Sequence, residues 1–230
     1  MNEIMGNSLF FGVMISVAAY EIGVLLKKKF KFAIFNPLLI AIAVIIVILA
    51  ITGVEYDTYN DGAKYLSYLL TPATVCLAVP LYEQLEILKK NLKAILAGIL
   101  AGALTSVTSV LILAIPFGLS HEEYVTLLPK SITTAIGMGV SEELGGIVTI
   151  TVAVIIITGV LGNMFAEVVC RIFRIEEPIA KGIGIGSASH AIGTAKAMEL
   201  GDIEGAMSSL SIAVSGLITV ILASVYAQFL

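Results

Sequence analysis

Residues 94–119 read AILAGILAGALTSVTSVLILAIPFGL, a run of 26 residues without a charged side chain. A helix that crosses the hydrocarbon core of a bilayer needs about 20 mostly apolar residues. This run exceeds that length, and it lacks the alternation of apolar and polar residues that a membrane β-strand requires. It therefore predicts a membrane-spanning α-helix.

The composition extends this prediction to the rest of the 230 residues. Hydrophobic residues make up 58% of the chain and charged residues 13%, and the mean hydropathy is +1.03. A soluble domain carries about 25% charged residues, because it must cover its surface with them. Cys76 and Cys170 lie in apolar stretches without metal-ligand spacing, so neither a metal nor a cofactor is expected. We expect an all-α polytopic protein of the bacterial inner membrane, with seven to eight membrane segments.

The expected segments differ in how continuous they are. Uninterrupted runs cover residues 34–53, 94–119, 145–166 and 205–230, and residues 4–26 make a fifth. Residues 65–82 are interrupted by Pro72 and Pro80. Two further stretches are short, at 131–141 and at 182–200, where Gly184 and Gly186 are the expected helix breaks.

The distribution of charge predicts the topology. Ten of the thirteen Lys and Arg residues lie in three loops, which contain Lys27, Lys28, Lys29 and Lys31; Lys89, Lys90 and Lys93; and Arg171, Arg174 and Lys181. The positive-inside rule places these loops in the cytoplasm and the N-terminus outside. The third loop would end outside if residues 124–141 crossed the membrane. Residues 120–144 are therefore predicted to form a re-entrant hairpin, which is tolerated where protein or water satisfies its backbone.

The remaining segments suggest an inverted repeat within a single transmembrane domain. After an N-terminal helix in residues 1–33, residues 34–119 and 145–230 each hold three segments, predicted to cross in opposite senses. The middle segment of each trio is the one broken by Pro or Gly. Such repeats are typical of secondary transporters, where a broken helix offers free N–H groups to an anion. Alternatively, Gly and Pro are simply commoner in membrane helices.

Polar residues gather in three segments. They read TPATVCLAVPLY at 71–82, PKSITTAIG at 129–137 and GIGIGSASHAIGTAKA at 182–197. Together these segments resemble the LrgB/CidB family of bacterial membrane proteins, which includes YohK-like proteins, and the resemblance covers nearly the whole chain. One departure is Ala135-Ile136, where the family pattern has a proline after the threonine pair.

The resemblance implies two kinds of function. Bacterial members are described as holin/antiholin-like modulators of murein hydrolase activity, paired with a small LrgA/CidA-type membrane partner. The related plastidial protein resembles a glycolate/glycerate transporter, and some bacterial pairs are implicated in pyruvate uptake. The first hypothesis is therefore a secondary transporter of small monocarboxylates, of the glycolate, glycerate, pyruvate or lactate class, and the alternative is an antiholin-like protein that controls lysis. Neither an enzyme nor a nucleic-acid-binding protein is expected.

A binding site for a monocarboxylate needs hydroxyl and N–H donors and one cation. The expected substrate-binding residues are Thr71, Thr74, Lys130, Ser131, Thr133, Thr134, Ser187, Ser189, His190, Gly193 and Thr194. Each has an ordinary alternative: a hydroxyl can bond to its own helix, His190 can serve helix packing, and Lys130 can extend to the interface. Gly98 and Gly102 are spaced for close helix contact, within the chain or in a homo-oligomer.

Overall fold

The computed structural model describes residues 10–30 and 35–230, and over these residues it contains helices and no strands. The all-helical prediction is confirmed for this part of the chain. Among the described residues, four helical stretches are long and apolar enough to cross a membrane, at Tyr56–Glu83, Leu85–Phe117, Val148–Ile172 and Asp202–Phe229, and Pro37–Thr52 is a shorter apolar helix. The chain is a multi-pass membrane protein. It forms two compact units, residues 1–76 and 77–230.

The first unit contains α2 (Phe11–Phe30), α3 (Pro37–Thr52), α4 (Tyr56–Ala63), the 3-10 helix η1 (Lys64–Leu69) and α5 (Leu70–Cys76). Asn36 caps α3, because its side-chain oxygen accepts from the N–H of Leu38 at 2.9 Å and of Leu39 at 3.2 Å. The predicted segments 4–26 and 34–53 both begin in residues outside the described part.

The two expected proline breaks lie near the boundary between the units. Pro72 is in α5, two residues after the change from 3-10 to α-helix, and Pro80 is in α6 (Ala78–Glu83). Proline has no N–H to donate to the carbonyl four residues earlier, which for Pro80 is that of Cys76. The helix is interrupted one residue after this carbonyl, at Leu77.

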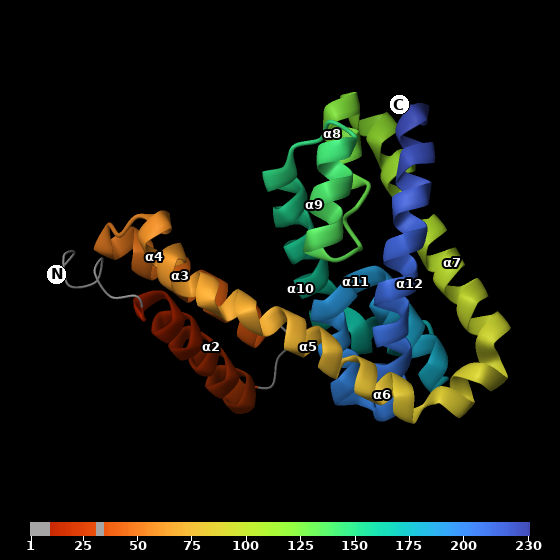
Figure 1. The fold of residues 1–230 in the computed structure, drawn as a ribbon, viewed down its shortest axis with the longest axis horizontal. Coiled ribbons are helices and arrows are strands. Elements are labelled where there is room, and N and C mark those ends of the chain that lie inside the picture. The colour runs from red at the N-terminus through yellow and green to blue at the C-terminus, as the bar shows by residue number, and fades with distance from the viewer. Residues whose placement is uncertain (1–9, 31–34) are drawn as a thin grey trace. The chain divides into compact units, whose positions relative to one another are not determined.

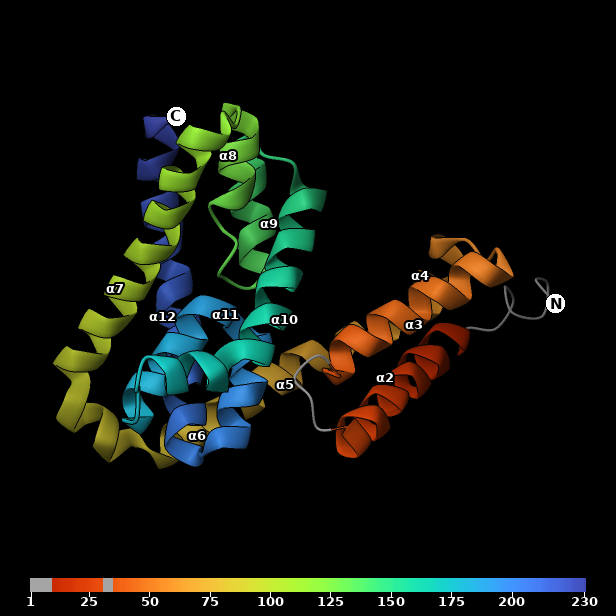
Figure 2. The ribbon, with the colours of Figure 1, turned by 180° about the vertical axis from the view of Figure 1, so that it is seen from behind.

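The second unit contains the helices around which the candidate site is built. After α6 it comprises α7 (Leu85–Phe117), α8 (His121–Leu127), α9 (Thr134–Glu143), α10 (Val148–Ile172), α11 (Pro178–Leu200), α12 (Asp202–Tyr226) and the 3-10 helix η2 (Ala227–Phe229). Figure 1 and Figure 2 show α8 and α9 beside the C-terminal ends of α7 and α12, and α11 toward the opposite end.

Helices α7 and α12 run in the same direction. Near their starts, Ile99 of α7 shares a buried cluster with Met207 of α12. Near their ends, Ala114 and Ala223 share another cluster, and the hydroxyls of Thr108 and Tyr226 lie 2.8 Å apart. The two helices therefore form a parallel frame, with one end at the start of α7 and the other at its C-terminus.

Residues 121–143 form a first hairpin that enters and leaves at the C-terminal end of α7. Tyr124, in its first arm α8, donates to the carbonyl of Tyr226 at 2.9 Å. Thr151, one turn into α10, donates to the carbonyl of Thr126 at 2.9 Å and to Ser141 Oγ at 2.7 Å, so both arms stand beside the start of α10. Pro129 lies in the turn, and α9 begins at Thr134 without the proline of the family pattern.

Residues 178–200 form a second hairpin that enters from the other end. The backbone of α11 leaves the helical conformation at His190, with φ 43° and ψ −141°. Gly186 before this break and Thr194 after it both contact Ser208 of α12. Farther from the break, Gly182 and Met198 both pack against the first turns of α12. Because both arms run along the same part of α12, the chain doubles back at His190.

This second hairpin corrects two predictions. The stretch 182–200 does not cross from one end of the unit to the other, because both of its ends lie at the start of α12. In consequence α12 runs parallel to α7, whereas three successive crossings in residues 145–230 would have made it antiparallel. The break also lies at His190, and not at Gly184 or Gly186, which are regular helical residues of the first arm.

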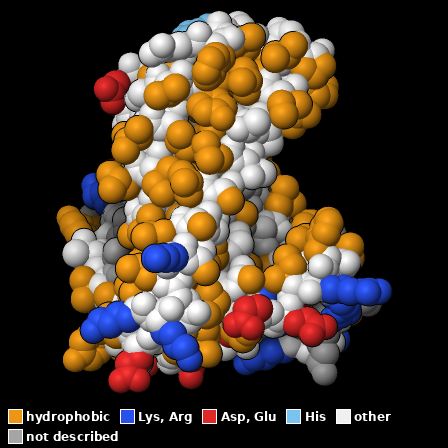
Figure 3. All heavy atoms as spheres, turned by 90° about the vertical axis from the view of Figure 1, so that its right-hand side faces the viewer, with side chains coloured by type: hydrophobic (Ala, Val, Ile, Leu, Met, Phe, Trp, Pro, Cys, Tyr) orange, Lys and Arg blue, Asp and Glu red, His pale blue; other side chains and the backbone are white. Residues whose placement is uncertain are grey.

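Surface polarity follows the same axis. Viewed from the α7 side, apolar side chains cover most of the height of the molecule, and charged side chains gather toward one end (Figure 3). Asn91 at the start of α7 and Ile179 at the start of α11 line one cavity, so these two helices begin at the same end. Lys89, Lys90 and Lys93, which lie in the first turns of α7 and not in a loop, therefore belong to the same end as Arg174 and Lys181 around the start of α11, and we call it the basic end.

Candidate functional site

A cavity of about 320 Å³ lies where the two hairpin tips meet the middle of α7. The first hairpin contributes Lys130 and Ser131 from its turn. The second hairpin contributes Ser187 and Ala188 from the end of its first arm, and α7 contributes Gly98, Gly102, Thr105, Ser106 and Ser109. We call this space the tip cavity. It is built from three elements that are far apart in the sequence.

Lys130 is the charged residue of the tip cavity. Its ammonium donates to Ser131 Oγ at 2.9 Å and to Ser106 Oγ at 3.3 Å, and Ser106 donates to Ser131 at 3.0 Å. Both serines are buried. These two contacts use two of the three N–H donors of a lysine ammonium and leave one for a further acceptor. Among the residues described in the structure, no carboxylate forms an ion pair with Lys130.

Two glycines of α7 allow the second hairpin to approach this closely. A Cβ atom at Gly102 would lie 2.8 Å from Ser187 Oγ and 3.0 Å from Ser187 Cβ, which is closer than an ordinary van der Waals contact. A Cβ atom at Gly98 would lie 3.3 Å from Ile183. Gly98 and Gly102 thus serve close helix contact within the chain, between α7 and α11.

The turn of the second hairpin is fixed by hydrogen bonds. His190 Nε2 lies 3.0 Å from the carbonyl of Ile155 in α10, and the hydroxyl of Thr194 donates to the His190 carbonyl at 2.9 Å. The same hydroxyl lies 2.7 Å from Ser208 Oγ. Asn163 of α10 donates to the carbonyl of Ile192 at 2.8 Å. These contacts hold His190, whose backbone is strained because L-residues rarely adopt a positive φ with this ψ.

The predicted site residues therefore fall into three groups. Lys130, Ser131 and Ser187 line the tip cavity. His190, Gly193 and Thr194 are buried at the turn of the second hairpin, while Ser189 lines a second cavity beside Gly162. The remaining predicted residues lie elsewhere: Thr133 and Thr134 are half-buried at the start of α9, Thr71 is exposed in α5, and the side chain of Thr74 is outside the described part.

Comparison with known proteins identifies the family. The LrgB-like family model matches residues 16–229. The chain belongs to the LrgB-like family. It is 39% identical over 222 residues to "Antiholin-like protein LrgB" of Bacillus mycoides (strain KBAB4) and of Bacillus cereus (strain B4264), covering 96% of this chain and of each relative. No solved structure matches the chain.

In this LrgB-like chain, sequence analysis missed the contribution of α7. Residues 94–119 were interpreted as a plain spanning helix, yet Ser106 holds Lys130 and Ser131 together. A signal was present, because Thr105, Ser106, Thr108 and Ser109 interrupt a run that is otherwise apolar. Four hydroxyls within five residues of a membrane helix indicate a polar neighbour across the helix interface.

Proposed function

We propose that this LrgB-like chain is a membrane transport component for small monocarboxylates and that it binds the carboxylate in the tip cavity. The observation that carries this proposal is Lys130, a cation among hydroxyl groups at the meeting point of two hairpins, without a carboxylate partner among the described residues. Ionisable residues within membrane proteins mark substrate or ion pathways by default.

The single positive charge of the site favours an anion with one carboxylate over an anion with two. A lysine at the centre of a membrane helix costs about 2.5–3.5 kcal/mol on insertion scales, and a bound anion removes much of this cost. Glycolate, pyruvate and lactate each bring one negative charge, which neutralises one ammonium. A dicarboxylate would leave one charge uncompensated in an apolar surrounding. The serine hydroxyls around Lys130 can donate to the second oxygen-bearing group of a hydroxy or keto acid.

The two hairpins support alternating access. Hairpins at membrane depth are tolerated where they line a cavity, and in transporters the substrate site lies near the midplane between discontinuous segments. Here the first hairpin approaches the tip cavity from one end of the frame and the second from the other. Displacement of one tip at a time would expose Lys130 to one side only, which is the requirement for secondary transport.

The hairpins also suggest a different inverted repeat from the one expected. The first hairpin followed by α10 and the second hairpin followed by α12 are equivalent units of opposite direction. We infer that the repeat comprises residues 121–172 and 178–226. The alternating charge of the loops supports a cytoplasmic location for the basic end and an extracytoplasmic one for the first hairpin.

The name of the relatives favours a second candidate function. Proteins that are 39% identical over 96% of the chain are named antiholin-like, so an antiholin-like role in the control of murein hydrolases and lysis is the competing proposal. In either role we propose a small LrgA/CidA-type membrane partner and a homo-oligomer. We propose no enzymatic step for this chain.

Uptake into proteoliposomes separates the two candidates. Purified protein, with and without the small partner, is reconstituted and offered labelled pyruvate or glycolate, while leakage of an entrapped dye reports pore formation. The transport proposal predicts saturable uptake, inhibited by unlabelled monocarboxylate, without dye leakage. Dye leakage without uptake of either acid, in both preparations, would contradict transport and favour the antiholin-like role.

A further inference from the structure

Three other cavities lie along the first arm of the second hairpin, and they share lining residues with the tip cavity or with one another. It shares Gly98 and Gly184 with a cavity of about 430 Å³ between the starts of α7 and α11. That cavity shares Ala180 and Gly184 with one of about 190 Å³ beside α10. The latter shares Lys181 with a fourth, of about 300 Å³, at the end of α10. The series leads from the hairpin tips to the basic end.

Small side chains on one face of the arm leave this space open. Ala180, Gly184 and Ala188 are spaced four residues apart, so they lie on the same side of the helix, and all three are exposed. A Cβ atom at Gly184 would meet no other atom within 4 Å. By contrast Gly182 and Gly186, on another face, pack directly against the backbone of α12.

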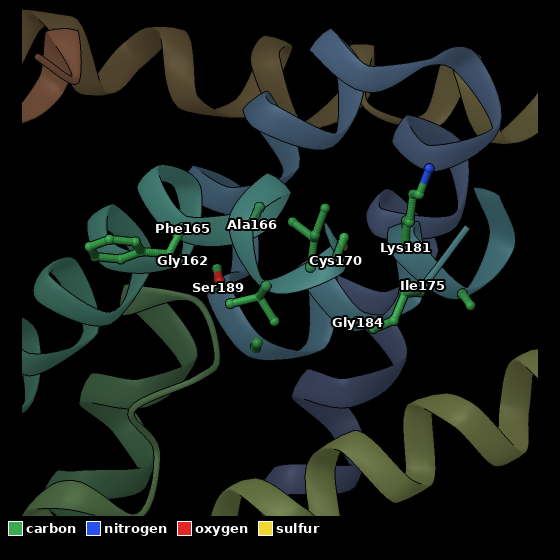
Figure 4. Close-up of a pocket in the computed structure, with 12 residues that line it drawn as sticks. Gly162, Phe165, Ala166, Cys170, Ile175, Lys181, Gly184 and Ser189 are labelled. Carbon is green, nitrogen blue, oxygen red and sulfur yellow. The ribbon is translucent and has the colours of Figure 1, made fainter. Parts of the chain in front are cut away.

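The third cavity shows how the series reaches the basic end. In Figure 4, Gly162 and Ser189 lie toward one side of this cavity and Lys181 toward the other. Gly184, in the arm itself, and Ile175, in the segment between α10 and α11, also line this cavity. The space therefore extends along the arm, from the neighbourhood of the hairpin turn to the lysine at its start.

The far end of the series carries positive charge. Arg171, Arg174 and Lys181 line the fourth cavity together with two acidic residues. One of these, Glu167, lies 2.5 Å from Lys196 of the second arm, which also pairs with Glu199 at 3.1 Å. The other is Glu176, so three cations and two carboxylates line this cavity. Glu177 lines the neighbouring cavity at the start of α11. This excess of cations raises the local concentration of small anions.

The opposite direction is closed by packing. Val107, Tyr124 and Leu128 are fully buried in a cluster that lies between the Ser106 level of α7 and its C-terminal end. Interiors of this kind leave few voids larger than a water molecule. The tip cavity therefore has neighbouring cavities toward the basic end, whereas buried side chains of α7 and of the first hairpin fill the space toward the other end.

We propose that this series of cavities is the passage by which the carboxylate moves between the tip cavity and the basic end, and that Gly184 limits the size of the anion that passes. The inference rests on the proposed transport function. Gly184 belongs to the first three cavities, so a side chain at this position projects into the space common to them. Gly184 also lines the tip cavity, so a large side chain at this position narrows the binding space as well as the passage.

The test is Gly184→Phe, with Gly139→Phe as the matched control. Gly139 is also helical, and a Cβ atom there would also meet no other atom within 4 Å, but it lies in α9 and lines none of these four cavities. We expect Gly184→Phe to lose uptake of labelled pyruvate and glycolate in proteoliposomes. Gly139→Phe is expected to keep the uptake of the wild type.

The outcomes distinguish this inference from the proposed function. If the wild-type protein neither binds nor transports a monocarboxylate, the proposed function fails. If the wild type transports and Gly184→Phe transports equally well, only the passage fails.

Labelling of a cysteine gives a readout that does not depend on uptake. In a Cys76→Ala, Cys170→Ala background, Gly184→Cys is treated with a negatively charged methanethiosulfonate added to inside-out vesicles. Reaction that slows when Lys181 is replaced by Gln supports a passage open to the basic end. An unreactive Gly184→Cys, beside a reactive Lys181→Cys control, would overturn it.

Discussion

Replacement of His190 tests whether the second hairpin turns at this residue. His190 has φ 43° and ψ −141°, a conformation that suits glycine and strains any residue with a Cβ atom. We compare His190→Gly with His190→Ala. Both variants lose the hydrogen bond to the Ile155 carbonyl and the packing of the imidazole against Gly159. Their difference therefore isolates the backbone at position 190.

The expected sign is the reverse of that in an ordinary helix. Within a helix, Gly is less stable than Ala by roughly 0.5–1 kcal/mol. In a sparsely populated backbone region, a residue with a Cβ atom costs about 1–3 kcal/mol. We expect His190→Gly to be more stable than His190→Ala by about 1 kcal/mol. For a protein of this size such a difference raises the melting temperature by about 2–4 °C.

The measurement is thermal unfolding of both variants in the same detergent. Ala195→Gly in the second arm is the control, because Ala195 is exposed and regularly helical. This control is expected to lower the melting temperature. If His190→Ala proves as stable as His190→Gly, or more stable, α11 is a continuous helix at this position and the turn is refuted.

Two further predictions concern packing and pH. Gly102→Leu would drive its side chain into Ser187, so we expect a loss of about 1–3 kcal/mol in the free energy of unfolding, whereas Gly98→Ala meets only a flexible side chain and should unfold close to wild type. Glu123 accepts hydrogen bonds from the N–H and hydroxyl of Ser120, which hold its pKa below the usual range. The stabilisation from the ionised Glu123 carboxylate is therefore present above its unfolded pKa and is lost as pH falls through its folded pKa. The melting temperatures of wild type and Glu123→Gln should differ at pH 6 and converge under more acidic conditions.

The sequence predicts the class of this fold well, because the signals are local. A run without charge, such as residues 94–119, must be a spanning helix, and α7 covers it. The return of residues 121–143 could be inferred from the basic residues that follow, since another crossing would have placed them on the wrong side. In both cases the length or the charge of one segment is enough to predict whether it crosses the membrane.

The second hairpin could not be predicted in this way. Gly184 and Gly186 are residues at which a helix break is expected from the sequence. In the structure Gly184 lies on an open face of the first arm, and Gly186 allows close contact with α12. The break falls at His190, where tertiary contacts from Ile155 and Thr194 hold an unfavourable backbone. Local propensity does not anticipate a strained residue, since the compensating groups come from distant segments.

The candidate site shows the same division. Lys130 and Ser187 were expected in one site from the sequence, and both line the tip cavity. Ser106 was missed because its role exists only when α7 meets the first hairpin, at 3.0 Å from Ser131. A site assembled from three elements depends on contacts that no single segment encodes.

The most direct test of carboxylate binding in the tip cavity is calorimetric titration of pyruvate and glycolate into purified wild-type protein and Lys130→Met. A hydrogen bond to a charged group contributes about 1.5–3 kcal/mol, which corresponds to a factor of about 10–150 in Kd. Lys90→Met, at an exposed residue near the start of α7, is the control. We predict that Lys130→Met weakens binding by this factor while Lys90→Met binds like wild type. Equal affinity of wild type and Lys130→Met would contradict the account.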